Sequence, residues 1–166
     1  MLKTGDTIVH SRYGAGEVMG FREIERDNEI KQYVCIKLAE DRGTLMIPAD
    51  QVEVEEIRPA MTDTQLIRQV MNNTPTHLDD NHRARQYAIE KKLKSGSPRQ
   101  IAQVVRDLSW REITDHLTQT DSRLKMDAIK RLIHELALND GALDIREQLS
   151  GIIDQAMNKH RLAAEV

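Results

Sequence analysis

Gly5-Asp6-Thr7-Ile8-Val9-His10-Ser11-Arg12-Tyr13-Gly14-Ala15-Gly16-Glu17-Val18 is the stretch that decides the fold. A β-branched run is followed by a turn that carries two glycines and by the start of a second β-type run. The stretch lacks the third glycine and the following helix of a phosphate-binding loop, so it predicts a turn between strands. We expect it to open a small module that works by contacting a partner.

The strand pattern continues to about residue 58. Residues 17–21, 30–38 and 44–47 are β-type runs bounded by Gly, Pro, Asp and Asn. Residues 27–29 and 40–43 are typical of hairpin connections. Four or five short strands at this spacing predict a small barrel or sandwich rather than a parallel sheet.

After Pro59 the pattern becomes helical. We expect about five helices: from Thr62 or Asp63 to Met71, from Asp79 or Asp80 to Lys94, from Pro98 with Ser97 as its cap, from Asp121 to Asn139, and from Asp144 to Leu162. Strands followed by helices predict an α+β chain of two segregated modules, residues 1–58 and 59–166.

Composition limits the class of protein. Aromatic residues make up 3% of the 166 residues, so the core must be mainly aliphatic, and a net charge of -3 argues against a chain that coats nucleic acid along its whole length. The single cysteine, Cys35, excludes an intramolecular disulfide framework, and we expect it to be a buried small hydrophobe. No secretion signal or membrane-span pattern is present, so we expect a soluble, cytoplasmic protein.

Catalytic and cofactor motifs are missing from the sequence. The six histidines lack the H-E-x-x-H spacing of a metal site, and no spacing specifies a nucleophile. We therefore expect no enzymatic activity, no metal and no cofactor.

The third predicted helix carries the only tryptophan. Ile101, Val104, Val105 and Leu108 form one apolar stripe, and Trp110 falls about 180° from Ile101 on a helical wheel. In one interpretation, Trp110 begins a second packed stripe on a helix that is bent or covered on two sides. In the other, it is an exposed wedge beside a basic surface, of the kind that inserts at distorted base steps.

Basic residues exceed acidic ones between residues 83 and 131, whereas the first 58 residues are acidic overall. Such asymmetry suggests two modules with different partners. The excess would support a handful of phosphate contacts and weak, salt-sensitive DNA binding. The alternative is an ordinary solvated helix face.

Several motifs together resemble one family. They are Gly5-Asp6-x-Ile8-Val9-His10-x-x-x-Gly14-x-Gly16-x-Val18, Tyr33-x-x-Ile36-Lys37-Leu38, Met46-Ile47-Pro48-Ala49-Asp50, Ile57-Arg58, Leu93-x-Ser95-Gly96-x-x-x-x-Ile101-Ala102-x-Val104-Val105-Arg106-Asp107-Leu108 and Glu135-Leu136-Ala137. In this order they resemble the CarD/CdnL transcription regulators, whose N-terminal module also occurs in the transcription-repair coupling factor. The chain is too short for that factor's motor.

The resemblance implies a Tudor-like, SH3-type barrel that pairs an edge strand with the RNA polymerase β subunit. It also implies a helical domain that sets a tryptophan against the opening promoter bubble. In many members the tryptophan directly follows Arg-Asp-Leu, whereas here Ser109 intervenes. Ile24 and Met46 stand where relatives carry polymerase-contacting arginines, which implies a more apolar contact.

The resulting assignments are as follows. For RNA polymerase binding we assign Arg22, Ile24, Arg26, Met46 and Pro48, and for DNA binding Trp110, Arg111, Arg106, Arg99, Arg83 and Arg85. We expect a monomeric transcription regulator that bridges the polymerase β subunit and promoter DNA and stabilises the open complex. The alternative is a protein–protein adaptor whose helical domain binds another protein instead of DNA.

Overall fold

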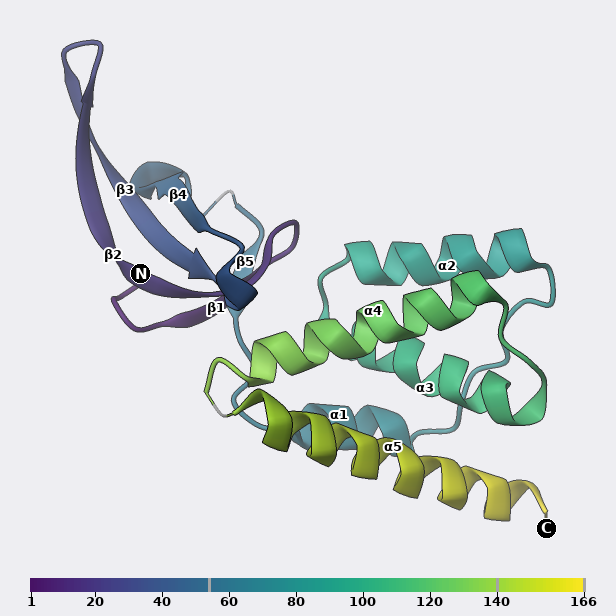
Figure 1. Ribbon diagram of the computed structural model, residues 1–166. Helices are drawn as coiled ribbons and strands as arrows, with labels where there is room; N and C mark the ends of the chain where they lie inside the picture. The colour runs from purple at the N-terminus through teal and green to yellow at the C-terminus, as the bar shows by residue number, and fades with distance from the viewer. Residues whose placement is uncertain (54, 140, 166) are drawn as a thin grey trace.

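An antiparallel sheet followed by a bundle of helices makes up the computed structural model, which describes residues 1–53, 55–139 and 141–165 (Figure 1). The predicted α+β class, with strands first and helices second, is confirmed. The sheet consists of β1 (Thr7–His10), β2 (Gly14–Arg26), β3 (Glu29–Leu38), β4 (Thr44–Pro48) and β5 (Ile57–Pro59). Their order is β4-β3-β2-β1-β5, so β4 and β5 are the edges.

The sheet encloses a small aliphatic core of its own. Its buried members are Ile8, Val18, Val34, Ile36, Leu38 and Ile47. Two short 3-10 turns, η1 (Ala39–Asp41) and η2 (Ala49–Gln51), follow β3 and β4. Cys35 is only half-buried, which corrects the expectation of a buried position, because its side chain alternates with those of the core and faces outward.

The β2–β3 hairpin is longer than the sequence predicted. Its register continues to the pair Arg26↔Glu29, whereas β4 pairs only with residues 33–37, so the end of the hairpin projects as a two-stranded ribbon (Figure 1). Asp27 and Asn28 have φ angles of 54° and 63°, the left-handed pair typical of a type I′ turn. The ribbon lacks the expected apolar alternation because both of its faces meet solvent.

Five helices follow: α1 (Gln65–Asn72), α2 (His82–Lys94), α3 (Pro98–Thr114), α4 (Gln119–Leu136) and α5 (Ala142–Ala164). Ser97 caps α3 with Pro98 at the first turn, as predicted. The other four predicted starts differ from the structure. Helix α1 begins after Thr64 in place of Thr62 or Asp63, and α5 begins at Ala142 in place of Asp144. Asn81 caps α2 in place of Asp79 or Asp80, and Thr118 caps α4 through a capping box in which Asp121 is the third helical residue.

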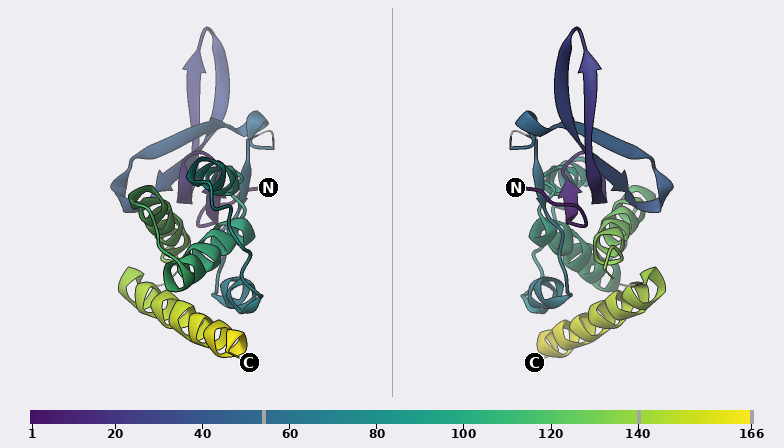
Figure 2. Two further views of the ribbon diagram at one scale, coloured as in Figure 1. Left: turned by 90° about the vertical axis from the view of Figure 1, so that its right-hand side faces the viewer. Right: turned by 90° about the vertical axis from the view of Figure 1, so that its left-hand side faces the viewer.

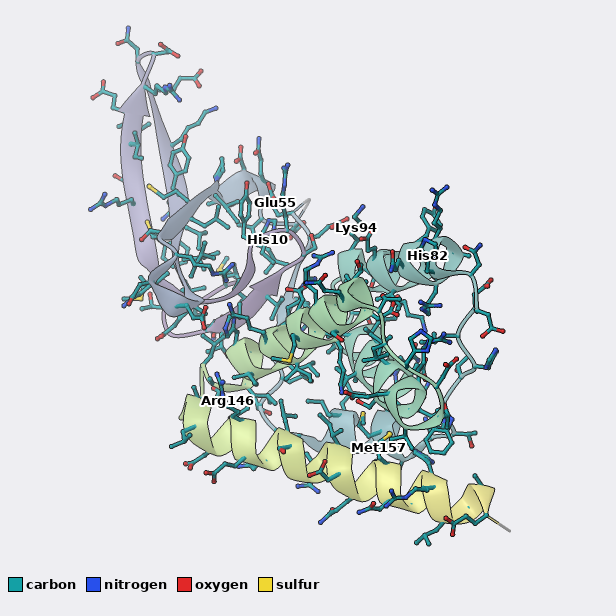
Figure 3. All side chains as sticks on the ribbon, turned by 45° about the vertical axis from the view of Figure 1, so that its right-hand side comes forward. His10, Glu55, His82, Lys94, Arg146 and Met157 are labelled. Atoms are coloured by element: carbon teal, nitrogen blue, oxygen red, sulfur yellow. The ribbon has the colours of Figure 1, made fainter. Side chains whose placement is uncertain are left out.

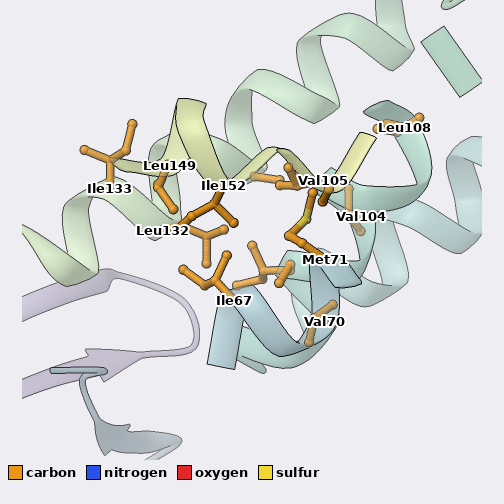
Figure 4. Packing of buried hydrophobic residues seen from close by; sticks show 14 of the residues in the cluster. Ile67, Val70, Met71, Val104, Val105, Leu108, Leu132, Ile133, Leu149 and Ile152 are labelled. Carbon is orange, nitrogen blue, oxygen red and sulfur yellow. The ribbon is translucent and has the colours of Figure 1, made fainter. Parts of the chain in front are cut away.

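The helical core surrounds α3, which packs against each of the other four helices. Ile101, Val104, Val105 and Leu108 are buried, as the apolar stripe predicted. Figure 4 shows α1 side chains meeting those of α3, α4 and α5 in this core. Since α3 is covered on several sides, one stripe does not describe its buried surface.

The two modules touch where α4 and the chain after β5 meet the base of the sheet. Val9, Ala15 and Ala60 form a small apolar contact there, with Leu138 packed against it. The hairpin points away from the helices in both side views (Figure 2). Among the described helices, none combines the length and apolar character needed to cross a membrane.

Candidate interaction surfaces

The outer face of the sheet gathers all the residues assigned to RNA polymerase. Arg22 lies opposite Tyr33, which lies opposite Pro48, and Cys35 lies opposite Met46. Ile24 and Arg26 follow Arg22 at intervals of two. Because directly opposed residues share a face and side chains alternate along a strand, the five assigned residues lie on one face, opposite the barrel core.

This outer face combines cations with partly covered apolar groups. Arg22 and Arg26 are exposed, whereas Ile24, Met46 and Pro48 are half-buried. β4, which carries Met46 and Pro48, is the last strand in the sheet order. An edge strand beside a mixed apolar and basic face can accept an extended strand from another protein.

The opening motif has a structural role in the turn between β1 and β2. His10 is buried, and its Nδ1 accepts hydrogen bonds from the backbone N–H groups of Arg12 (3.0 Å) and Tyr13 (3.3 Å). The ring proton therefore lies on Nε2, which donates to Glu55 Oε2 at 2.9 Å. His10 and Glu55 lie at the end of the sheet next to the helices (Figure 3).

The two glycines of the motif have different roles. Gly14 has a φ angle of +84°, which favours glycine. Gly16 allows a close approach, since a Cβ there would lie 2.7 Å from Ile36 Cγ2 and 2.9 Å from the Lys37 carbonyl oxygen. These contacts explain the spacing of the motif without any ligand.

Trp110 lies in the last turns of α3 and is half-buried. One side packs against the helical core, and its ring meets that of His160 edge-on, with centroids 6.1 Å apart and planes at 77°. His160 Nε2 in turn lies 2.7 Å from the Met71 carbonyl oxygen, which fixes the imidazole. The side chain is therefore supported from within and still reaches the surface, and its role as a wedge stays a prediction.

The preceding position is buried. Ser109 is 3% exposed and directly follows Arg106-Asp107-Leu108. Trp110, the next residue, lies on the side of α3 that reaches solvent beside Pro75, Leu78 and Thr114. Ile113, one turn further, is 44% exposed, so a fully packed second stripe does not form.

Three of the five arginines assigned to DNA are buried, which corrects the expectation of a basic surface built from them. Arg85 is 2% exposed and forms a two-point ion pair with Asp121 at 3.1 Å and 2.9 Å. Burial raises the pKa of the Asp121 carboxyl, but hydrogen bonds from Arg85 and Thr118 outweigh this and hold the pKa below its ordinary value. This pair joins α2 to α4.

The other two buried arginines belong to α3. Arg106 donates to Asp107 Oδ1 at 2.8 Å and to the Val70 carbonyl oxygen at 3.3 Å. Arg111 is 8% exposed and lies 3.2 Å from Asp115, whose pKa is lowered by a hydrogen bond from His116 and by Arg111. Arg106 thus connects α3 to the end of α1, whereas Arg111 pairs with carboxylates near the end of its own helix and before α2.

Two assigned arginines, Arg83 and Arg99, are exposed and can meet a phosphate backbone. On α2, Lys91, Lys94 and the 72% exposed ring of Tyr87 lie on the same side as Arg83. Sequence reasoning missed Tyr87 as a surface group, although its spacing of four residues from both Arg83 and Lys91 indicates a shared face.

A buried ion pair joins the two modules. Arg58 of β5 donates two hydrogen bonds to the Glu135 carboxylate, one of them at 2.9 Å, and a third to the Gly96 carbonyl oxygen at 2.9 Å. The backbone N–H of Met61 also donates to Glu135, at 2.8 Å. The sequence contained a clue to this pair, because Glu135 interrupts the apolar stripe of α4 that includes Leu132 and Leu136. A carboxylate in such a stripe is buried and requires a partner.

No group of three or more His, Cys, Asp or Glu side chains is arranged to hold a metal in the part of the chain that the structure describes. The hollow beside Trp110 contains Asp107 and Asp115, both of which pair with neighbouring arginines.

Comparisons with known proteins match both modules. Residues 2–61 match the family model of the CarD-like/TRCF RID domain, and residues 66–149 match that of the CarD, C-terminal domain. The chain is 29% identical over 144 residues to a Bacillus subtilis (strain 168) protein named "Putative transcription factor YdeB". This similarity covers 85% of the chain and 94% of the Bacillus protein.

Proposed function

Because the chain belongs to the CarD-like family of transcription factors, we propose that it binds the RNA polymerase β subunit and stabilises the open promoter complex. The observation that carries this proposal is the gathering of Arg22, Ile24, Arg26, Met46 and Pro48 on one sheet face beside the edge strand β4. The protein acts by binding, without catalysis or a cofactor.

In the proposed complex, a strand of the polymerase extends the sheet along β4. Backbone hydrogen bonds supply affinity, and the side chains of the outer face supply specificity. Met46 and Pro48 give an apolar centre, which excludes water from the surrounding polar contacts. Arg22 and Arg26 meet acidic groups at the rim and speed association.

Trp110 is the proposed wedge at the upstream edge of the bubble. A side chain that contacts only opened DNA shifts the closed-to-open equilibrium by its difference in affinity for the two states. About 1.4 kcal/mol is a tenfold shift, so one aromatic contact is sufficient. The packing of Trp110 against His160 lowers the entropy lost when the ring inserts.

The variant Met46→Glu tests the polymerase-binding surface. It places a charge in β4 that must lose its hydration when a polymerase strand binds there. We expect weaker binding of the isolated β subunit in a pull-down or by calorimetry. Ile30→Glu is the matched control, since Ile30 is 70% exposed and lies in the β2–β3 hairpin opposite Glu25, on the other face of the sheet from Met46. If the Met46 variant and the original protein bind the β subunit with equal affinity, the outer sheet face is not the polymerase-binding surface.

The wedge is tested by Trp110→Ala in open-complex lifetime measurements with purified polymerase. We expect a lifetime roughly tenfold shorter, with unchanged binding to the β subunit. Tyr87→Ala is the control, because it removes an exposed aromatic ring from α2 without touching the proposed wedge. An unchanged lifetime for a folded Trp110→Ala protein contradicts the assignment.

The adaptor alternative is favoured by the burial of Arg85, Arg106 and Arg111, which leaves fewer cations for phosphates. In that case the helical domain binds another protein. Measurement of DNA affinity in the presence of polymerase distinguishes promoter binding from the adaptor alternative. Promoter binding predicts an affinity that falls steeply with salt, whereas the adaptor predicts that the protein adds nothing to DNA binding.

A further inference from the structure

A cavity of about 260 Å³ lies between the two modules and is lined by both. The sheet contributes the β1–β2 turn, with Arg12 and Tyr13, and Arg42 after η1. The helical module contributes one face of α4, including Lys130. The cavity is separate from the outer sheet face and from the hollow beside Trp110.

Each carboxylate of the cavity lies within 4.0 Å of a basic side chain. Glu135 pairs with Arg58, and Asp127 lies 3.2 Å from Arg131. Glu40 lies 2.6 Å from His134 Nε2 and 3.9 Å from Lys130 Nζ. The acidic groups of the lining therefore each have a basic neighbour of their own.

Two guanidinium groups in the lining remain without a carboxylate. Within the described ranges, 1–53, 55–139 and 141–165, neither Arg12 nor Arg42 has an acidic oxygen within 4.0 Å. Arg42 donates its Nε–H to the Ala39 carbonyl oxygen at 3.0 Å, which leaves its two terminal nitrogens for another acceptor. Arg12 lies 6.0 Å from the centre of the Tyr13 ring. Two such cations beside one cavity favour an anion.

The turn that carries Arg12 and Tyr13 is held in place before any ligand arrives. The buried ring of His10 accepts both of their backbone N–H groups, and Glu55 fixes that ring. Arg42 lies over Gly14, with its Nη2 3.1 Å from where a Cβ would stand. A site of this kind binds with less loss of conformational entropy than a mobile loop.

We propose that this cavity binds a phosphorylated small molecule of the nucleoside polyphosphate class. Arg12 and Arg42 hold the phosphate oxygens, because a guanidinium matches phosphate geometry with paired hydrogen bonds. The volume is slightly below the range of about 300–1,000 Å³ usual for ligand pockets, so the phosphates enter and the base stays at the rim. There the 41% exposed ring of Tyr13 stacks on the base.

Calorimetric titration of the full-length protein with ATP and with inorganic pyrophosphate tests the site. Arg12→Ala/Arg42→Ala should weaken binding of both probes by roughly a hundredfold, about tenfold for each charge-assisted contact. The matched control is Arg22→Ala/Arg26→Ala, which removes two exposed arginines from the hairpin and should leave both affinities unchanged. Thermal melts check that each variant is folded.

Tyr13→Leu separates the two parts of the ligand. It should weaken ATP binding and leave pyrophosphate binding unchanged, because only ATP carries a base that can stack. The absence of binding of both probes to the unmodified protein overturns the proposal. An equal loss in the Arg22/Arg26 control also overturns it, since the attraction is then a general effect of charge. These titrations contain neither polymerase nor DNA, so their outcome is independent of the proposed transcription role.

Discussion

Replacing Glu135 with alanine should remove the main polar link between the two modules. The Glu135 side chain is 3% exposed, and it accepts hydrogen bonds from Arg58 and from the backbone of Met61. Removing one partner of a buried ion pair destabilises a protein by roughly 3–5 kcal/mol, because the other charge is left unpaired. Arg58 is 26% exposed and regains some water, so we expect about 3 kcal/mol, at the lower end of that range.

Thermal unfolding measures this loss directly. For a chain of this size about 2–4 °C corresponds to each kcal/mol, so the Tm of Glu135→Ala should fall by about 6–12 °C. Glu112→Ala is the matched control: Glu112 also pairs with a cation of another segment, Lys125, but it is 57% exposed. That exposed pair should contribute less than about 1 kcal/mol.

A double-mutant cycle assigns the loss to the pair itself. Arg58→Met and Glu135→Ala together should destabilise less than the sum of the single changes, because the double variant leaves no unpaired charge. Additive effects within about 0.5 kcal/mol, or a Tm loss no larger than that of Glu112→Ala, would refute the reasoning. Neither substitution changes Met46 or the outer sheet face, so the variants should still bind the β subunit.

Three further predictions concern single side chains. Gly16→Ala should destabilise the sheet by about 1–3 kcal/mol in urea denaturation, because its methyl group would overlap a side chain and a carbonyl oxygen of β3; an unchanged midpoint contradicts this. His160→Ala should shift the fluorescence of Trp110 to longer wavelength as water reaches the ring, and an unaltered spectrum means that the contact has no effect. The lowered pKa of Asp121 stabilises the fold above the ordinary value of about 4, and this contribution is lost as pH falls through the folded-state pKa. Asp121→Asn should therefore be less stable than the original protein at pH 7 and show a weaker loss of stability in acid, whereas parallel melting curves would exclude Arg85–Asp121 as the cause.

The sequence predicted the strands of the sheet well where short-range residue preferences determine the structure. Turn residues mark the ends of strands: Gly14 begins β2 and Gly43 directly precedes β4. Gly16, predicted to belong to the same turn as Gly14, lies inside β2 and is paired on both sides. The length of the β2–β3 hairpin was missed because its end has no buried face. A strand that is exposed on both sides carries no alternation of apolar and polar residues to detect.

The roles of the arginines were predicted less well, for a physical reason. A helix in the centre of a bundle is covered on several sides, so charged residues away from its main apolar stripe can still be buried. Arg106 and Arg111 are of this kind, since the other helices and residues 73–81 surround α3. Arg106 pairs with the adjacent Asp107 and Arg111 with Asp115 at the end of the same helix. Their other contacts, with the Val70 carbonyl oxygen, Thr76 and Asp80, come from segments that the sequence alone does not bring together.

The family motifs of this chain mark positions that fix geometry more than positions that touch partners. His10 holds a turn, Gly16 permits close packing, and Arg58 with Glu135 joins the modules. The outer sheet face and Trp110 lie on separate modules, so their relative placement depends on that joint. If both surfaces must engage one promoter complex, a change at Glu135 should weaken open-complex stabilisation while each surface still binds its own partner. Loss of polymerase binding in Glu135→Ala would instead mean that the sheet itself depends on the helices.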